Sequence, residues 1–172
     1  MRVLETVFPA LKVHKRIQGK VHWEAIAQGL GTPLPPDFIE LSEWYPSFIL
    51  ADFLAIHLPG PGEEAGFVAG CRDDREDLED LRDAGMSHGY VPYPEPGGLI
   101  AWGGSQEGDV FYWKTSESGP SSWTIVVSGR NDDWCEFQGT LTEYLAGLIS
   151  GKVSPDGLPP NFPGHNPLVE IS

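Results

Sequence analysis

The stretch GGLIAWGGSQEGDVFYWKT, residues 97–115, decides how the sequence is interpreted. Two apolar and aromatic runs, LIAWGG (99–104) and DVFYWKT (109–115), flank a glycine-rich connection, and this pattern predicts two β-strands joined by a turn. Its tryptophans, Trp102 and Trp113, could form an aromatic platform for a ligand, belong to a catalytic loop, or lie at the centre of the fold. The residues of this stretch alone leave these three interpretations open.

Further strands are predicted on both sides of this stretch. SWTIVVSG (122–129) and DWCEFQG (133–139) are separated by a short Gly-Arg-Asn-Asp connection, which is typical of a meander. The apolar run FLAIHLPGPG (53–62) predicts another strand, ended by Pro-Gly turn signals. Because no helices are expected between the strands after residue 97, an antiparallel sheet is favoured over a parallel one.

Periodic apolar residues predict four helices, over 22–30, 35–45, 71–85 and 140–151. The last is the best marked, because Thr140 and Glu143 have the spacing of a capping box. In the charged helix 71–85, Leu78, Leu81 and Ala84 are expected to face inward. The order of helices, then consecutive strands, then a helix predicts an α+β fold with a central antiparallel sheet (meander) flanked by helices.

The length of 172 residues predicts one domain spanning 1–172. The Pro-rich C-terminal tail, residues 153–172, contains five prolines and no periodic pattern. Its apolar residues, among them Leu158 and Phe162, would either lie across the body of the protein or leave the tail mobile.

The sequence is strongly acidic, with a formal net charge of −14. Residues 1–22 carry a net charge of +4, whereas the rest of the chain carries −18. An acidic body repels the phosphate backbone, so we expect no direct binding of nucleic acid. The charge would instead attract a basic protein partner, the alternative being that it serves solubility alone.

The sequence predicts a cytoplasmic protein that does not associate with a membrane. Residues 1–17, MRVLETVFPALKVHKRI, lack the apolar run of a signal peptide, and no stretch reaches the roughly 18 apolar residues of a membrane span. Two cysteines, Cys71 and Cys135, are too few for a disulfide framework and are expected to be free thiols.

The sequence contains no familiar catalytic motif, such as a nucleophile elbow, a zinc-protease helix, a P-loop or a dinucleotide-binding loop. We therefore expect no catalytic residue, no cofactor and no metal. Cys135 is interpreted as a small apolar residue and His57 as a structural or edge histidine. Glu107 and Asp109 could form a glycosidase-like acid pair, but we favour a turn-stabilising role for Asp109 and a solvated Glu107.

Residues 63–83 contain nine acids and three arginines. Such a run is commonly a solvated helix face, but its density also suits an interaction surface for a basic partner. The candidate partner-binding residues are Glu63, Glu64, Asp73, Asp74, Glu76, Asp77, Glu79 and Asp80.

Five short segments resemble, in the same order, segments of the SUKH superfamily, the bacterial immunity proteins related to fungal cell-wall assembly regulators. They are LGTPLPPDFIELSEWY (30–45), LIAWGGSQEGDVFYWKT (99–115), PSSWTIVV (120–127), DWCEF (133–137) and TLTEYLAGLISG (140–151). The resemblance covers roughly residues 22–152, and residues 1–21, 67–96 and the tail have no matching counterpart.

The resemblance implies an α+β fold and a non-enzymatic role, since many members of that superfamily bind and neutralise a toxin domain, often a nuclease. It also implies that the residues of the shared motifs are chiefly structural, and that Gly103 allows the backbone to turn where a side chain would clash. These residues are Pro35, Asp37, Trp102, Gly103, Asp109, Trp113 and Trp123.

Three functions follow as hypotheses. The first is an immunity protein that neutralises a basic, nuclease-type toxin domain in a contact-dependent or polymorphic toxin system. The second is a regulatory or scaffold module for protein interactions, like the cell-wall regulators. The third is a carbohydrate-binding or carbohydrate-active protein, which requires Glu107 and Asp109 to share a cleft with exposed tryptophans.

Overall fold

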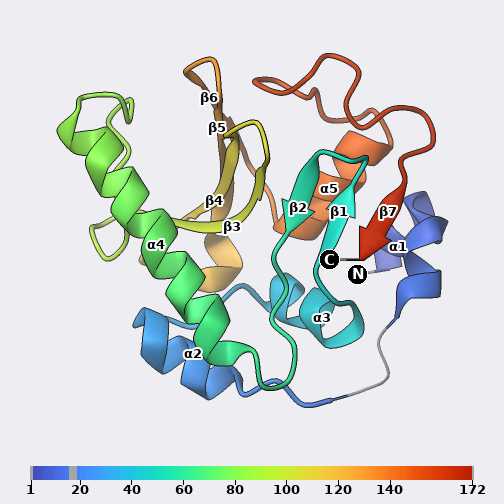
Figure 1. Cartoon of the computed structure of the whole chain (residues 1–172), viewed down its shortest axis with the longest axis horizontal. Helices are drawn as coiled ribbons and strands as arrows, with labels where there is room; N and C mark the ends of the chain where they lie inside the picture. Colours follow the sequence, from blue (N-terminus) through green and yellow to red (C-terminus); the bar gives the residue numbers. More distant parts are fainter. Residues whose placement is uncertain (1, 16–18, 172) are drawn as a thin grey trace.

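The structure, a computed structural model, describes residues 2–15 and 19–171 of the chain. Figure 1 labels its α-helices and strands. The elements follow one another as α1 (Arg2–Val7), the 3-10 helix η1 (Pro9–His14), α2 (Trp23–Leu30), α3 (Pro36–Trp44), β1 (Phe48–Leu50), β2 (Leu54–Ile56), α4 (Glu64–Asp83), β3 (Leu99–Ser105), β4 (Val110–Lys114), the 3-10 helix η2 (Pro120–Ser122), β5 (Thr124–Gly129), β6 (Asp133–Phe137), α5 (Leu141–Ile149) and β7 (Val169–Ile171).

The predicted α+β class and the antiparallel sheet are confirmed. The seven strands form one sheet in the order β6-β5-β4-β3-β2-β1-β7, and every neighbouring pair is antiparallel. Strands β3 to β6 are a meander, as the glycine-rich and Gly-Arg-Asn-Asp connections predicted. Helix α4 lies across one face of the sheet, and α5 lies on the opposite side (Figure 1).

The central strands bury both of their faces, so they show a continuous run of apolar residues. On one face, the main core collects apolar side chains of the sheet together with those of α1, α3 and α5. On the other face, Leu99, Ala101, Tyr112 and Val126 pack with Leu78 of α4. A β-bulge in β3 leaves Trp102 as an extra residue between the paired Ala101 and Gly103, and Trp102 faces the main core as Ile100 does.

Helices α3 and α5 are joined through the shared-motif residue Asp37. Its carboxylate accepts hydrogen bonds from the Thr142 backbone N–H (2.9 Å) and hydroxyl (3.1 Å) at the start of α5. The predicted capping box is also present, with Thr140 and Glu143 each bonding the other's backbone N–H. Together these contacts satisfy backbone donors that a helix start leaves unpaired.

The prediction for helix 71–85 was wrong at its start. Helix α4 already begins at Glu64, so the glycine-rich segment 64–70 is helical. Its Phe67 and Val68 pack on the main core, and this tertiary burial outweighs the low helix propensity of glycine. At the other end Leu78 is buried and Leu81 half-buried as expected, but Ala84 is exposed and lies just past Asp83, the last residue of the helix.

The predicted strand 53–62 is shorter than expected, because only Leu54–Ile56 forms β2. The sequence also gave no sign of β1, which pairs with β2 as a hairpin. The turn between them places Ala51 and Asp52 at positive φ (55° and 52°), so it lacks the glycine that usually marks such a turn in a sequence.

Gly103 has a different role from the one predicted. It lies inside β3, not in the turn, and a Cβ atom there would approach the Ala55 carbonyl oxygen of β2 to 2.5 Å. The predicted clash is therefore real, but glycine allows two strands to approach closely instead of allowing the chain to reverse.

The two terminal segments that match nothing in the resemblance complete the core. Leu4, Phe8 and Leu11 of the N-terminal segment are buried in the main core. In the tail, Leu158 and Phe162 are buried and β7 adds an edge strand to β1, so the tail lies across the body.

We expect Asp37→Ala to lower the free energy of unfolding by about 1–2 kcal/mol, because the Thr142 donors would lose their acceptor. Urea denaturation followed by circular dichroism measures this change. The control is Glu43→Ala on the exposed side of the same helix, expected to stay within about 0.5 kcal/mol of the native protein. Equal losses in both variants would contradict the assignment.

Glycines in α4 and β3 should respond in opposite ways to alanine. A Cβ at Gly66 or Gly70 would meet no atom within 4 Å, so each Gly→Ala change should stabilise the protein by about 0.5–1 kcal/mol. Gly103→Ala should destabilise it by more than about 1 kcal/mol, because the Ala55 carbonyl must move. Thermal unfolding of the three variants tests the sign of each change.

Candidate functional site

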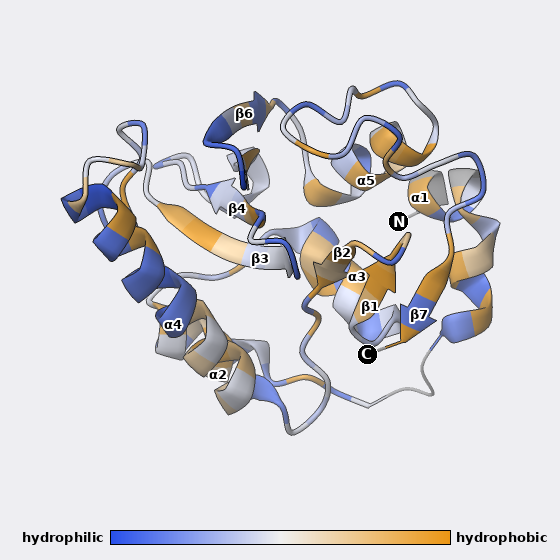
Figure 2. Cartoon of the chain, turned by 45° about the horizontal axis from the view of Figure 1, so that its top comes forward, coloured by the Kyte–Doolittle hydropathy of each residue, from blue (hydrophilic) through white to orange (hydrophobic). Residues whose placement is uncertain are grey.

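Helix α4 carries most of the predicted partner-binding residues and presents them in three different settings. The helix crosses the sheet obliquely, and its C-terminal half is strongly hydrophilic (Figure 2). Asp73, Glu76, Asp77 and Asp80 recur at the i, i+3, i+4, i+7 spacing of one helix face, and all four are exposed. We call these four residues the outer strip; it extends about 10 Å along the helix axis.

Glu63 and Glu64 at the start of α4 are engaged in contacts within the protein. The Glu63 carboxylate accepts a hydrogen bond from the Gly60 backbone N–H (2.6 Å). The Glu64 carboxylate accepts one from the His22 backbone N–H (2.9 Å), which lowers the pKa of Glu64. Both side chains therefore secure the entry of the helix, at a distance from the outer strip.

Asp74 points the other way from the outer strip, towards the sheet. Its position shares the helix face of Cys71 and Leu78, and the side chain is half-buried. Burial raises the pKa of Asp74, and the nearby charges of Asp77 and Asp73 add to the increase, whereas His57 opposes it. The sequence pattern did not distinguish Asp74 from the other acids of residues 63–83.

The three arginines of α4 do not neutralise the outer strip. Arg72 donates to the Gly29 carbonyl oxygen (3.2 Å), Arg75 pairs with Glu79 (3.3 Å), and Arg82 pairs with Asp83 and Glu95. Within residues 2–15 and 19–171, no cation forms an ion pair with an acid of the outer strip. Four adjacent carboxylates consequently face solvent without a counter-charge.

Hollows lie on both sides of α4, where it does not cover the sheet. On the side of α2, a cavity of about 350 Å³ is lined mainly by apolar atoms, and Tyr112 and Cys71 belong to its wall. On the side of β1 and β2, two adjoining hollows of about 560 and 360 Å³ both include His57 and Asp74 in their walls. We call these two hollows together the hairpin groove.

The predicted role of the opening stretch as a structural centre agrees with the burial of its aromatic residues. Trp102 and Trp113 are each 1% exposed, so neither ring offers a face on which a sugar could stack. Trp123 and Pro35 are buried as well. The exposed tryptophans on which the carbohydrate hypothesis depended are therefore absent from this hairpin.

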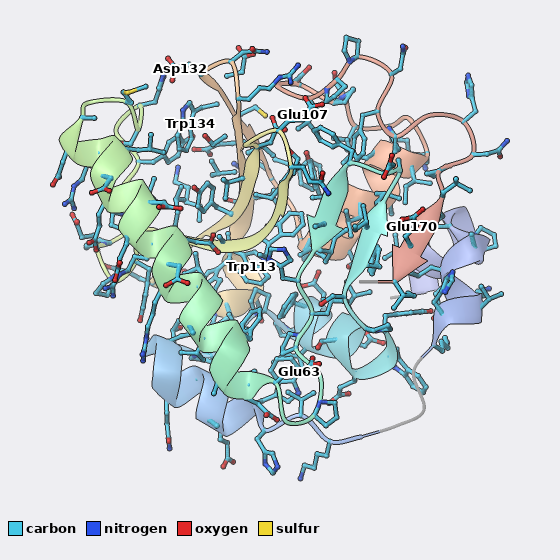
Figure 3. The ribbon with its side chains drawn as sticks, viewed as in Figure 1. Glu63, Glu107, Trp113, Asp132, Trp134 and Glu170 are labelled. Carbon is cyan, nitrogen blue, oxygen red and sulfur yellow. The ribbon has the colours of Figure 1, made fainter. Side chains whose placement is uncertain are left out.

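The acid pair of that hypothesis is also occupied by internal contacts. Asp109 is buried, accepts a hydrogen bond from the Ser105 hydroxyl, and accepts another from the Arg130 backbone N–H (3.0 Å). Glu107 forms an ion pair with the Arg130 guanidinium. Asp109 thus links the β3–β4 and β5–β6 turns. Figure 3 shows that Glu107 lies at the end of the sheet remote from Glu63.

Sequence reasoning missed an aromatic cluster beside the C-terminal half of α4. Trp134 of β6 stacks on Tyr90 (centroids 4.8 Å apart) and lies near Tyr112 (6.3 Å). Tyr90 donates to Glu136 (2.9 Å), which also pairs with Lys114 and whose pKa that lysine lowers. Alternation along DWCEF placed Trp134 and Glu136 on one face, but nothing in the sequence connected that face with Tyr90.

Three further observations concern the part of the chain that the structure describes. No group of three or more metal-ligating side chains is found among residues 2–15 and 19–171. No helix formed by these residues is long and apolar enough to span a bilayer. Cys71 is a buried free thiol and Cys135 a half-buried one, and burial raises the pKa of Cys135 to about 11.

Comparisons with protein-family models, with curated proteins and with solved structures found no match to this chain.

We expect Asp74→Asn to raise the melting temperature of the free protein at neutral pH. The raised pKa means that the folded protein holds the neutral form of Asp74 more readily than the unfolded chain does, so ionisation of this carboxyl opposes folding. Ionised Asp74 destabilises the native protein to its full extent once the pH exceeds the raised pKa. Asparagine cannot ionise, so the variant lacks this destabilisation. The exposed neighbour Asp77→Asn should change the melting temperature less.

The pH dependence of the two melting curves provides a second readout. The advantage of Asp74→Asn should disappear below the ordinary aspartate pKa of 3.8, where the carboxyl is protonated in both states. Differential scanning calorimetry between about pH 3 and pH 7 measures it. A variant that is less stable than the native protein at pH 7 would show that Asp74 has a stabilising partner.

Proposed function

We propose that this protein is a non-enzymatic immunity protein that binds and neutralises a basic toxin domain through the outer strip of α4. The observation that carries the proposal is the four exposed carboxylates at positions 73, 76, 77 and 80, which no cation of the described chain neutralises. A surface of this kind is complementary to the cationic active site or rim of an enzyme that holds phosphate groups.

The shape of the surface supports a protein partner. A helix 20 residues long crosses the face of the sheet and presents one continuous side to solvent. The hydrogen bonds of Glu63 and Glu64 hold its N-terminal end, and Leu78 holds its C-terminal half on the sheet. Since the backbone is fixed before binding, an incoming protein need not order this surface.

The sequence resemblance to the SUKH superfamily gives the proposal its biological setting, a toxin–immunity system. The net charge of −14 supports an encounter steered by electrostatic attraction, which added salt would weaken. A nuclease toxin is the partner class that this charge favours, because its active site must be positive to hold nucleic acid.

The proposal is tested by reversing the outer strip with Asp73→Lys, Glu76→Lys, Asp77→Lys and Asp80→Lys in one variant. Immobilised native protein first captures partners from the cytosol of its source at about 50 mM salt, where screening is weak. The captured domain is then produced alone, and its association rate is measured by surface plasmon resonance. We expect the reversed variant to associate about 10–100-fold more slowly, with a flattened salt dependence.

A matched control carries the same change of charge elsewhere. Glu24, Glu43, Glu117 and Glu170 are exposed on other elements, and their replacement by lysine alters the net charge equally. An equal loss in this control would show that net charge matters and the outer strip does not.

Growth assays complete the test of neutralisation. Expression of the captured domain should arrest growth, and co-expression of the native protein should restore it more fully than co-expression of the reversed variant. A captured set of unrelated host proteins without toxicity would contradict the immunity role and favour the regulatory module instead.

A further inference from the structure

The hairpin groove lies between α4 and the β1–β2 hairpin and is open because small residues line it. Ala55, Ala101 and Gly103 are on its sheet side, and Gly66 and Gly70 are on its helix side. Nothing lies within 4 Å of a Cβ built on either helix glycine. A polypeptide chain can therefore approach the backbone of α4 closely at this place.

The charges that face the hairpin groove are almost all negative. The acids in its walls are Asp52, Glu63, Asp73, Asp74 and Asp109. Among the residues that line the groove, only His57 has a basic side chain. Glu63 and Asp109 already accept hydrogen bonds from the protein backbone. This leaves Asp52, Asp73 and Asp74 as the carboxylates available to an incoming group.

Asp74 lies where the two hollows meet, since it belongs to the walls of both. Its half-buried carboxylate forms no hydrogen bond and no ion pair with any residue in 2–15 and 19–171. A carboxylate in such a place is stabilised by a cation that brings its own hydrogen-bond donors. The guanidinium of arginine is weakly hydrated and offers paired donors to a carboxylate, so it suits this position better than an ammonium group.

We propose that the hairpin groove binds an arginine-bearing segment of the partner protein, with the guanidinium on Asp74 and the peptide backbone against Gly66 and Gly70. The inference rests on the proposed function, because it makes the groove a second part of the same interface. Asp73 connects the two parts, as it belongs both to the outer strip and to the groove wall. A partner seated on the outer strip consequently reaches the groove without leaving the surface.

The test uses a defined probe, the peptide acetyl-Gly-Arg-Gly-Arg-Gly-amide, titrated into isotopically labelled full-length protein and followed by NMR. We expect the largest shifts at backbone amides along the groove, from Ala55 and His57 to Gly66 and Gly70. The same peptide with citrulline in place of arginine keeps the planar shape, the Nε–H and one NH2 donor group, but it replaces the other NH2 by a carbonyl oxygen and removes the charge. It should bind at least about tenfold more weakly.

Two variants interrupt the groove in independent ways. Asp74→Asn removes the negative charge, and Gly70→Leu fills open space without creating a buried polar group. Each should weaken binding of the arginine peptide by about tenfold or more. The matched control, Glu76→Gln with Asp80→Gln, alters the outer strip alone and should weaken it by less than about threefold. Circular dichroism verifies that each variant is folded.

The inference is overturned if the shifts lie outside the groove, if the citrulline peptide binds equally well, or if both groove variants bind like the native protein. Shifts that depend on protein concentration without peptide would identify a second copy of the chain as the occupant and would also overturn it. The outcome is separable from that of the proposed function. Suppose that reversal of the outer strip abolishes partner capture, whereas Asp74→Asn and Gly70→Leu leave it unchanged. That result would refute the binding role of the hairpin groove and leave the proposed function standing.

Discussion

The packing of Trp113 is the contact on which the rest of the structure depends. Its ring meets Phe38 of α3 edge-on at 4.8 Å and lies near Trp102 and Trp123 at 6.4 and 6.3 Å. Strand β4 is thereby fixed to a helix, to its neighbouring strand and to the segment that leads into β5. Rings of this size bury a large apolar area, so one side of the sheet becomes the closely packed core of the protein.

The opposite side of the sheet is covered by one helix, and the proposed function follows from that difference. Helix α4 buries Leu78 against the sheet but is too narrow to cover β1 and β2 as well. Small residues such as Ala55 and Ala101 leave space beside it instead of filling it. Surfaces where packing is incomplete and charge is uncompensated are the places where a partner can gain most from binding.

The candidate site shows how far a charge pattern can be interpreted from sequence. The density of acids in residues 63–83 correctly identified an acidic helix, but it could not assign a direction to each side chain. In the structure Glu64 bonds to a backbone N–H 42 residues away and Asp74 turns towards the sheet near His57. Such relations depend on the packing of α4 against α2 and across β3, which no local pattern encodes.

By itself the sequence determined the features that depend on near neighbours along the chain: the strands on either side of the 105–108 connection, the meander and the capping box of Thr140 and Glu143. These follow from local propensity and from the alternation or periodicity of apolar residues. Only the tertiary structure decided that the glycine-rich segment 64–70 is helical, that β1 exists and that the tail supplies β7. In each case burial against residues distant in the sequence outweighs a weak or contrary local preference. The free energy gained from this burial exists only once the fold has brought those residues together.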